Sequence, residues 1–236
     1  MSLIELHSVK RGMKKKLFNE VKNTANLKLH DIRMYIDEID ITTISPLSSI
    51  SDFDNATKGL FFVYLYGVFE NIIKTTVTVT IECINNSSIA LSNCKKELLC
   101  MAFDGEYTSL YNVGNDKKWE KRWNISTRLR ENLNIIINPN VFPTDGKNIK
   151  VKELESLFKS FGFIEDILPR GEIGGYINEM VKNRNHIAHG DELPHEVGRR
   201  YTITDIKKSF ECIDEYCTYF IDICENYIEN NKYIET

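Results

Sequence analysis

Apolar residues recur at helical spacing over most of the chain, which predicts a fold built almost entirely from α-helices. The clearest case is the C-terminal segment, where we expect a long helix to begin near Thr204, with Thr204 as N-cap and Asp205 in the first turn. Its apolar residues step by four and three in strict alternation, a heptad pattern suited to packing along another long helix. They are Ile206, Phe210, Ile213, Cys217, Phe220, Cys224 and Tyr227.

The N-terminal part predicts two more long helices. A basic amphipathic helix is expected over about 10–39, followed by a linker over 41–55 in which Asp52 or Asp54 could cap the next helix. That next helix is expected over about 56–84.

The end of this second helix is ambiguous, because "TTVTVTIECI" (75–84) alternates like a strand. No convincing partner strand lies nearby in the sequence, so a helix is the better prediction. The following residues, 85–150, are the least regular. They contain "KKWEKRW" (117–123) and a loop that closes at Asn148.

Two shorter helices precede the C-terminal one. "VKELESLFKSFG" (151–162) has an apolar side and Gly162 as a natural C-cap. A further helix over about 172–189 should stop at Gly190, which can adopt the left-handed conformation, and Pro194 indicates that this helix does not resume. The prediction is therefore an all-α protein, with a helical domain over 51–236 and a basic helical extension over 1–50.

Composition is that of a soluble globular protein with one substantial core, at 236 residues, 42% hydrophobic and 27% charged. The net charge of −4 hides an asymmetry. Residues 10–33 hold eight basic and two acidic side chains, whereas residues 205–236 hold eight acidic side chains and three lysines. Local positive patches can therefore exist on a mildly acidic protein.

Targeting signals are not evident. The N-terminus has no signal-peptide-like apolar stretch, and the most apolar run, 60–69, falls well short of the ~20 residues needed to span a bilayer. The six cysteines form no CxxC and are expected to be free thiols in a reducing compartment. We expect a cytoplasmic protein with no membrane contact.

The candidate chemistry lies in "VKNRNHIAHGDELPHEVGRR" (181–200), which holds three of the five histidines. His189 falls at the carboxyl end of the predicted helix, where the dipole favours imidazolium, so it can titrate near neutrality as an acid/base catalyst must. Arg184 lies about 140° around the helix from His189 and ~7.5 Å along it, while Asn185 is only about 40° away. Arg184 and His189 would converge on one phosphate more easily if two copies of the helix faced each other, which indicates a dimeric site.

Other polar clusters in the sequence have more than one interpretation. His186, His189 and His195 could suggest a metal site, but HExxH spacing is lacking and no cysteine is near, so we expect no metal and no cofactor. "KKWEKRW" mixes cations and aromatics as single-stranded nucleic-acid surfaces do, yet Trp119 and Trp123 fit better as core anchors of one helix face. The run 14–16 of lysines reads as a solvated helix face that could assist RNA docking.

The stretch "INEMVKNRNHIAHG" (177–190) resembles the signature of HEPN domains, a motif of Arg, a polar residue, three residues and then His. Arg184, Asn185 and His189 match it, and the wording "RNxIAHG" is most similar to the prokaryotic RiboL-PSP-HEPN branch. "LFFVYLYGVFENII" resembles the early HEPN helix with its acidic residue, here Glu70, and "GKNIKVKELESLFKSFG" resembles the segment before the motif helix. The likeness covers roughly residues 56–230.

This resemblance implies a homodimeric, metal-independent endoribonuclease of toxin–antitoxin or antiphage systems, with its active cleft at the dimer interface. It implies Arg184, Asn185 and His189 as catalytic residues, and an RNA product with a 2′,3′-cyclic phosphate beside one with a 5′-hydroxyl. An antitoxin or sensor protein would be a further partner. The rival interpretation is a non-catalytic HEPN module that binds RNA or a partner protein.

Further residues around the motif have possible roles in the site. Glu70 could be a paired charge that fixes the bundle or could approach the cleft, and the structural role is favoured. Some HEPN toxins carry a Tyr two residues after the motif His that is nucleotidylated; Asp191 stands there, so this regulation is not expected. The candidate substrate-binding residues are Lys182, His186, Arg199 and Arg200.

Overall fold

The computed structural model describes residues 3–43, 51–131, 133–144 and 148–235, with side chains at the N-terminal end described from residue 12 to residue 40. Residues 44–50 of the predicted linker (41–55) and residues 145–147 of the loop that closes at Asn148 lie outside this part of the chain; residues 41–43 of that linker belong to α1 and residues 52–55 to α2. The described residues form helices and no strand, only isolated β-bridges, which confirms the all-α prediction. The α-helices are α1 (Leu3–Thr43), α2 (Asp52–Asn85), α3 (Lys96–Ala102), α4 (Asp104–Asn112), α5 (Lys118–Arg130), α6 (Val151–Phe161), α7 (Ile173–His189), α8 (Pro194–Gly198) and α9 (Ile203–Glu229).

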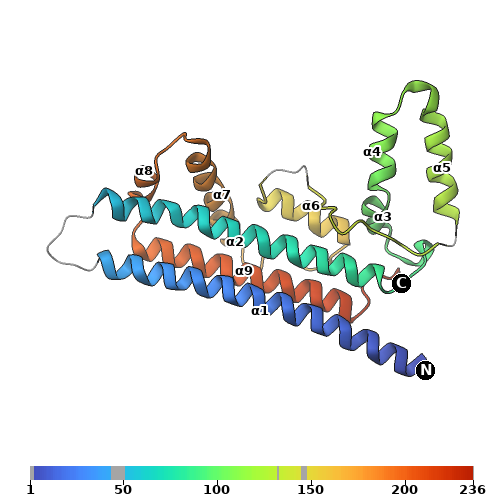
Figure 1. The fold of residues 1–236 in the computed structure, drawn as a ribbon, viewed down its shortest axis with the longest axis horizontal. Helices are drawn as coiled ribbons and strands as arrows, with labels where there is room; N and C mark the ends of the chain where they lie inside the picture. The colour runs from blue at the N-terminus through green and yellow to red at the C-terminus, as the bar shows by residue number, and fades with distance from the viewer. Residues whose placement is uncertain (1–2, 44–50, 132, 145–147, 236) are drawn as a thin grey trace.

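Three long helices, α1, α2 and α9, run side by side and form the body of the molecule (Figure 1). Helices α7 and α8 pack against α2 near one end of this body, and α6 lies beside them. Helices α4 and α5 stand away from the body at its other end (Figure 1). The predicted basic extension therefore packs against both α2 and α9.

Helix α2 continues through the ambiguous stretch 75–84, so the helix prediction is confirmed. Thr76 and Thr80 donate their hydroxyl hydrogen bonds to carbonyls one turn back, those of Ile72 and Thr76, at 2.7 Å each. These bonds satisfy buried polar atoms inside the helix, which is why the β-branched run does not need a partner strand. Among the described helices α2 alone is long and apolar enough to cross a membrane, but 56% of its most apolar window is buried, as in the core helix of a soluble protein.

Helices α2 and α9 both begin with a capping box, and in each the N-cap residue precedes the predicted one. Ser51 caps α2 and Thr202 caps α9, and each hydroxyl accepts a hydrogen bond from the backbone of an aspartate three residues on, Asp54 or Asp205. The aspartate side chain returns the bond to the N-cap backbone, so the acid belongs to the first turn and the hydroxyl is the cap. The predicted caps Asp52, Asp54 and Thr204 were wrong for this reason.

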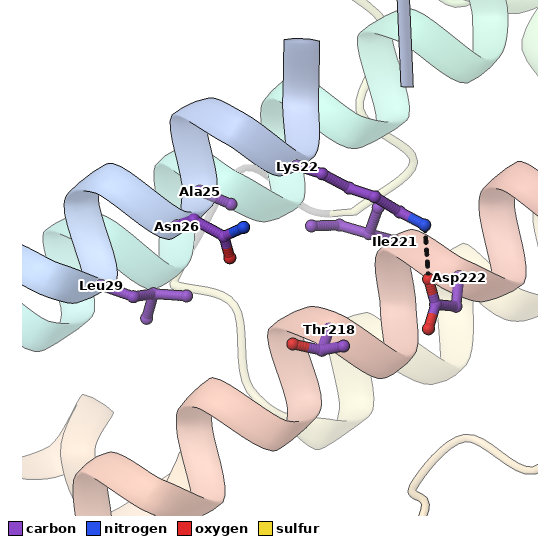
Figure 2. A pocket seen from close by; sticks show the side chains of 7 residues that line it. All are labelled: Lys22, Ala25, Asn26, Leu29, Thr218, Ile221 and Asp222. Carbon is purple, nitrogen blue, oxygen red and sulfur yellow. Dashed lines mark ion pairs between the residues drawn. The ribbon is translucent and has the colours of Figure 1, made fainter. Parts of the chain in front are cut away.

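Opposite charges join α1 to α9, which explains the charge asymmetry of the sequence. Lys22 lies 2.9 Å from Asp222 of α9 (Figure 2), and Arg33 pairs with Asp214. A cavity of about 280 Å³ remains between the two helices, where Ala25 and Thr218 are too small to fill the space (Figure 2). Two of the basic side chains of α1 are therefore neutralised by carboxylates of α9.

The heptad seam of α9 is buried inside the same chain. From Ile206 to Tyr227, none of the seven seam residues exposes more than the 6% of Phe210. The seam packs along α1 and α2, as a heptad pattern predicts, but it leaves no free surface for a second copy. Of the cysteines, all of which are free, Cys100 is exposed and the other five are buried.

The middle segment holds more structure than expected, because α3, α4 and α5 all fall within 85–150. Trp119 and Trp123 do lie on one helix, α5, but they are 60% and 65% exposed. The prediction that they anchor the core was wrong. Their four-residue spacing describes a helix face equally well whether that face is covered by protein or open to solvent.

Candidate functional site

The motif residues lie at the carboxyl end of α7, where the predicted stop is confirmed. Gly190 has φ 75°, and its N–H donates to the carbonyl of Ile187 at 3.1 Å. The next N–H, of Asp191, donates to the carbonyl of His186 at 2.9 Å. These bonds satisfy carbonyls of the last helical turn that would otherwise be unpaired, and they fix the chain direction after His189.

Helix α8 then returns the chain to α2. Pro194, predicted only to prevent α7 from resuming, is the first residue of α8, a position where its missing N–H costs nothing. Gly59 of α2 and Gly198 of α8 allow an unusually close approach. A Cβ on Gly198 would lie 1.8 Å from the carbonyl oxygen of Asn55, so only glycine fits there.

Helix α7 is also held to α2 by a partly buried polar network around Tyr201. The Tyr201 hydroxyl accepts a hydrogen bond from Asn183 at 2.7 Å and donates one to Glu179 at 2.9 Å. Its ring lies 4.6 Å from that of Phe62, and Lys58 donates to its carbonyl at 2.8 Å. Burial raises the pKa of Tyr201 to about 12, so it stays protonated as the donor of this network.

The three motif side chains line one open cavity of about 540 Å³. The geometry of a straight helix predicted that Arg184 and His189 would not converge tightly. The two side chains line the same cavity and do not contact each other. Residues of α2, α6 and the segment before α6 complete the lining. The lining residues are Glu70, Asn148, Lys150, Glu153, Arg184, Asn185 and His189.

Arg184 is held in place from two sides. Its guanidinium lies 4.9 Å from the centre of the Tyr66 ring, a cation–π arrangement over a buried aromatic residue of α2. It also donates hydrogen bonds to the side-chain oxygens of Asn148 at 3.2 Å and Asn185 at 3.0 Å. Arg184 therefore presents its positive charge to the cavity in a fixed position, at little further cost in side-chain entropy.

Asn148 links the motif to the rest of the site. Its amide nitrogen donates to the side-chain oxygen of Asn185 at 2.8 Å, while its oxygen accepts from Arg184. The next residue, Ile149, is fully buried, and its N–H donates to the Tyr66 hydroxyl at 3.2 Å. Tyr66 thus fixes both the Arg184 guanidinium and the backbone that carries Asn148.

His189 differs from Arg184 in its surroundings. Its side chain is exposed at the rim of the cavity, and no hydrogen bond or ion pair joins it to any described residue. Its imidazole is therefore accessible to a bound molecule and to solvent. Such access is needed for acid/base catalysis, which also requires a second group for the other proton transfer.

Two carboxylates, from α2 and α6, also line the cavity. Glu70 of α2 lines the cavity and accepts a hydrogen bond from Lys74 at 2.8 Å. Of the two alternatives for Glu70, approach to the cleft is the one that matches its position, since its ion pair is at the surface and not in the core. Glu153 is nearly buried and accepts a hydrogen bond from the backbone of Lys150 at 3.0 Å.

The candidate substrate-binding residues do not line this cavity. His186 Nδ1 lies 3.3 Å from Glu192, and Arg200 donates to the same carboxylate at 3.1 Å. Arg200, through this hydrogen bond, holds the pKa of Glu192 below its ordinary value. Arg199 pairs with Asp52 at 2.8 Å, and Lys182 is exposed outside the cavity lining.

Several residues of the site were not predicted. Asn148, Lys150 and Glu153 line the cavity and Tyr66 contacts Arg184; all four are distant from the motif in sequence and reach it because α2 and α6 pack near α7. The usable signals were the likeness of "LFFVYLYGVFENII", which contains Tyr66, to the early HEPN helix and that of "GKNIKVKELESLFKSFG" to the segment before the motif helix. No group of three His, Cys, Asp or Glu side chains that could hold a metal is found in the part of the chain the structure describes.

One comparison with known proteins gave a match. The family model described as RiboL-PSP-HEPN matches residues 29–226, from within α1 to near the end of α9. Searches of curated proteins and of solved structures gave no match. The family match covers most of the chain, including every residue of the cavity. This protein therefore belongs to the RiboL-PSP-HEPN family.

Proposed function

We propose that this protein is a metal-independent endoribonuclease whose reaction takes place in the cavity beside the end of α7. Membership of a HEPN family already indicates an RNase-like or RNA-related function. The observation that carries the finer proposal is the meeting of Arg184, Asn185 and His189 in one open cavity, with Arg184 fixed by Tyr66 and Asn148.

The proposed reaction is attack of an RNA 2′-hydroxyl on the adjacent phosphorus. A base removes the hydroxyl proton, the P–O5′ bond breaks, and an acid gives a proton to the departing 5′-oxygen. The products are a 2′,3′-cyclic phosphate and a 5′-hydroxyl. His189 would perform one of the two proton transfers, each typically worth roughly 10²–10⁴-fold in rate.

Arg184 would bind the non-bridging phosphate oxygens as negative charge develops on them. A fixed cation in a protein cavity stabilises such charge without having to reorganise during the reaction. Asn185 shares its side-chain oxygen between Arg184 and Asn148, so it would keep the guanidinium oriented toward the phosphate. Lys150 adds a second positive charge to the lining.

A second proton-transfer group is needed, and we propose that a second copy supplies it. Each copy has His189 exposed at the rim, so a twofold arrangement with the two cavities facing would bring two histidines to one phosphate. The α9 seam cannot form this interface because it is buried within the chain. Light scattering should give about twice 27.4 kDa. A monomer that still cleaves RNA would contradict the two-copy site.

The biological role that fits this activity is that of a cytoplasmic toxin or antiphage effector, restrained by an antitoxin or sensor protein. A nuclease whose cavity is open to solvent must be held inactive until it is needed, since RNA is always present in the cell. Co-expression of a neighbouring antitoxin should suppress both toxicity and RNA cleavage.

The direct test is incubation of purified protein with total RNA in EDTA, followed by analysis of the fragment ends. We expect discrete fragments with 2′,3′-cyclic phosphate and 5′-hydroxyl ends at full rate in the chelator. Loss of cleavage in EDTA and its return with zinc or manganese would overturn the metal-independent mechanism. RNA binding without cleavage under any condition would favour a non-catalytic module.

A further inference from the structure

Helices α4 and α5 form a hairpin, here called the arm (residues 104–130), that packs against the hydrophobic core only through the partly buried Ile125. Every residue of both helices is described, and none is buried. In Figure 1 the arm projects from the end of the body opposite to α7 and α8. A hairpin without a buried side chain contributes little to folding, so its exposed residues need another explanation.

The base of the arm is nevertheless fixed to the body. Just after the arm, residues 133–135 are hydrogen-bonded to residues 89–91, with the Leu91 N–H donating to the Leu133 carbonyl and the Ile135 N–H to the Ile89 carbonyl, each at 2.8 Å. Within the arm, Arg128 of α5 pairs with Glu106 of α4, and its guanidinium lies 4.7 Å from the buried Phe103 ring. The arm is thus a held projection and not a free tail.

Large aromatic side chains are exposed along the arm. Tyr111 is 87% exposed, Trp119 60% and Trp123 65%. The two tryptophan rings lie one helical turn apart on α5, with centroids separated by 6.4 Å. Arg122 lies over the Trp119 ring at 4.7 Å, which orients both groups on the same part of the surface. Such flat exposed rings offer stacking surfaces.

The charge on α5 identifies the kind of partner. The helix carries five basic residues, Lys118, Lys121, Arg122, Arg128 and Arg130, against one acidic residue, Glu120. Of these cations only Arg128 has an ion pair with a described residue, whereas those of α1 that face α9 are matched by its carboxylates. Unmatched cations beside exposed aromatics complement a polyanion that carries planar groups.

We propose that the arm binds single-stranded RNA, with bases stacked on Trp119 and Trp123 and phosphates near Lys121 and Arg122. Single strands are favoured over duplexes because only unpaired bases expose their faces to aromatic side chains. Tryptophan and arginine are also enriched at protein interfaces, but the excess of five cations over one carboxylate on α5 favours a polyanion over a protein partner. The proposal rests on the proposed function only in that RNA is the substrate: the arm would hold a strand whose other part reaches the cavity.

The chain provides its own probe, because Trp119 and Trp123 are its two tryptophans. The His189→Ala protein, chosen to prevent cleavage, is titrated in EDTA with an oligouridylate of about 12 nucleotides, within the length that such sites cover. Intrinsic fluorescence should be quenched in proportion to binding. Duplex RNA of the same length should quench much less.

Labelled oligouridylate then tests individual side chains by fluorescence anisotropy. Trp119→Ala and Trp123→Ala should each weaken binding about fivefold or more, the usual loss for one base–aromatic stack. Phe53→Ala is the matched control, since Phe53 is 77% exposed but lies at the start of α2. Replacement of Lys121 and Arg122 by Glu should weaken binding and reduce its salt dependence.

Unchanged affinity in both tryptophan variants, or absence of quenching, would overturn the arm proposal. Tryptophan variants that differ from the wild type in particle mass by light scattering, but bind RNA as tightly, would overturn it as well. They would identify the arm as a protein contact. The two proposals fail separately. Quenching without any cleavage by the wild type would contradict the nuclease and not the arm, and cleavage without quenching would contradict the arm alone.

Discussion

The cavity beside α7 and the arm differ in how the chain holds their polar and aromatic groups. In the cavity, Arg184 is fixed by a buried ring, by Asn148 and by Asn185, which come from different parts of the sequence. In the arm no residue is buried, and neither α4 nor α5 has a side-chain N-cap bond. A site that must position one phosphate requires the first kind of construction, whereas a surface that only retains a strand can use the second.

The largest effect is expected from Arg184, and it should separate the two regions. Arg184→Ala should lower the cleavage rate at least ~10²-fold and weaken RNA binding, because a fixed charge toward the phosphate is lost. Lys182→Ala is the matched control, since Lys182 is a neighbouring exposed cation outside the cavity lining. Cleavage of a dinucleotide, too short to reach the arm, should fall in Arg184→Ala and stay normal in Trp119→Ala. Equal losses in Lys182→Ala would mean that charge alone, without position, matters.

The next effect concerns the scaffold under the cavity. Gly198→Ala should destabilise the protein by about 2 kcal/mol or more in urea unfolding, because its Cβ would meet backbone that cannot move aside. Gly67→Ala, in the same α2 bundle but with open space around it, should stabilise the protein by about 0.5–1 kcal/mol. If both substitutions behave alike, the close approach of α8 to α2 is not what holds the chain after the motif.

The smallest effect is the pH dependence of the stability that the capping box of α9 provides. The arm helices α4 and α5 have no side-chain cap. The Thr202 hydroxyl and backbone hold the pKa of Asp205 below its ordinary value of 3.8. The ionised aspartate therefore contributes stability above pH 3.8, and that contribution is lost as the pH falls through the depressed pKa. The difference in unfolding free energy between wild type and Asp205→Ala should shrink in strong acid. A difference between the two proteins that is the same at neutral pH and in strong acid would contradict this role of Asp205.

Sequence patterns predicted the long helices well, because α1, α2, α6, α7 and α9 each carry a periodic apolar face. They failed where one N-cap residue had to be chosen among several neighbouring residues that could all cap a helix. The caps are Ser51 and Thr202, whereas the prediction had named neighbouring residues. Sequence patterns also failed for Trp119 and Trp123, because periodicity identifies a face and does not say what covers it.

The candidate site was predictable only along one helix. Arg184, Asn185 and His189 share a short motif, and that motif was enough to place them at a helix end. Asn148 and Tyr66 entered through long-range packing, which no local pattern encodes. Conversely, Arg199 and Arg200 are close to the motif in sequence but bind Asp52 and Glu192 instead of lining the cavity.

The most direct test of the account is the RNA cleavage rate of His189→Ala in EDTA, measured beside its fold and its RNA affinity. The side chain is exposed and without a partner among the described residues, so the variant should fold normally, with an unchanged circular dichroism spectrum and melting temperature. RNA affinity should stay close to that of the wild type, while cleavage should fall at least ~10²-fold. A folded His189→Ala protein that cleaves RNA at the wild-type rate would show that this residue ends a helix and does not move a proton.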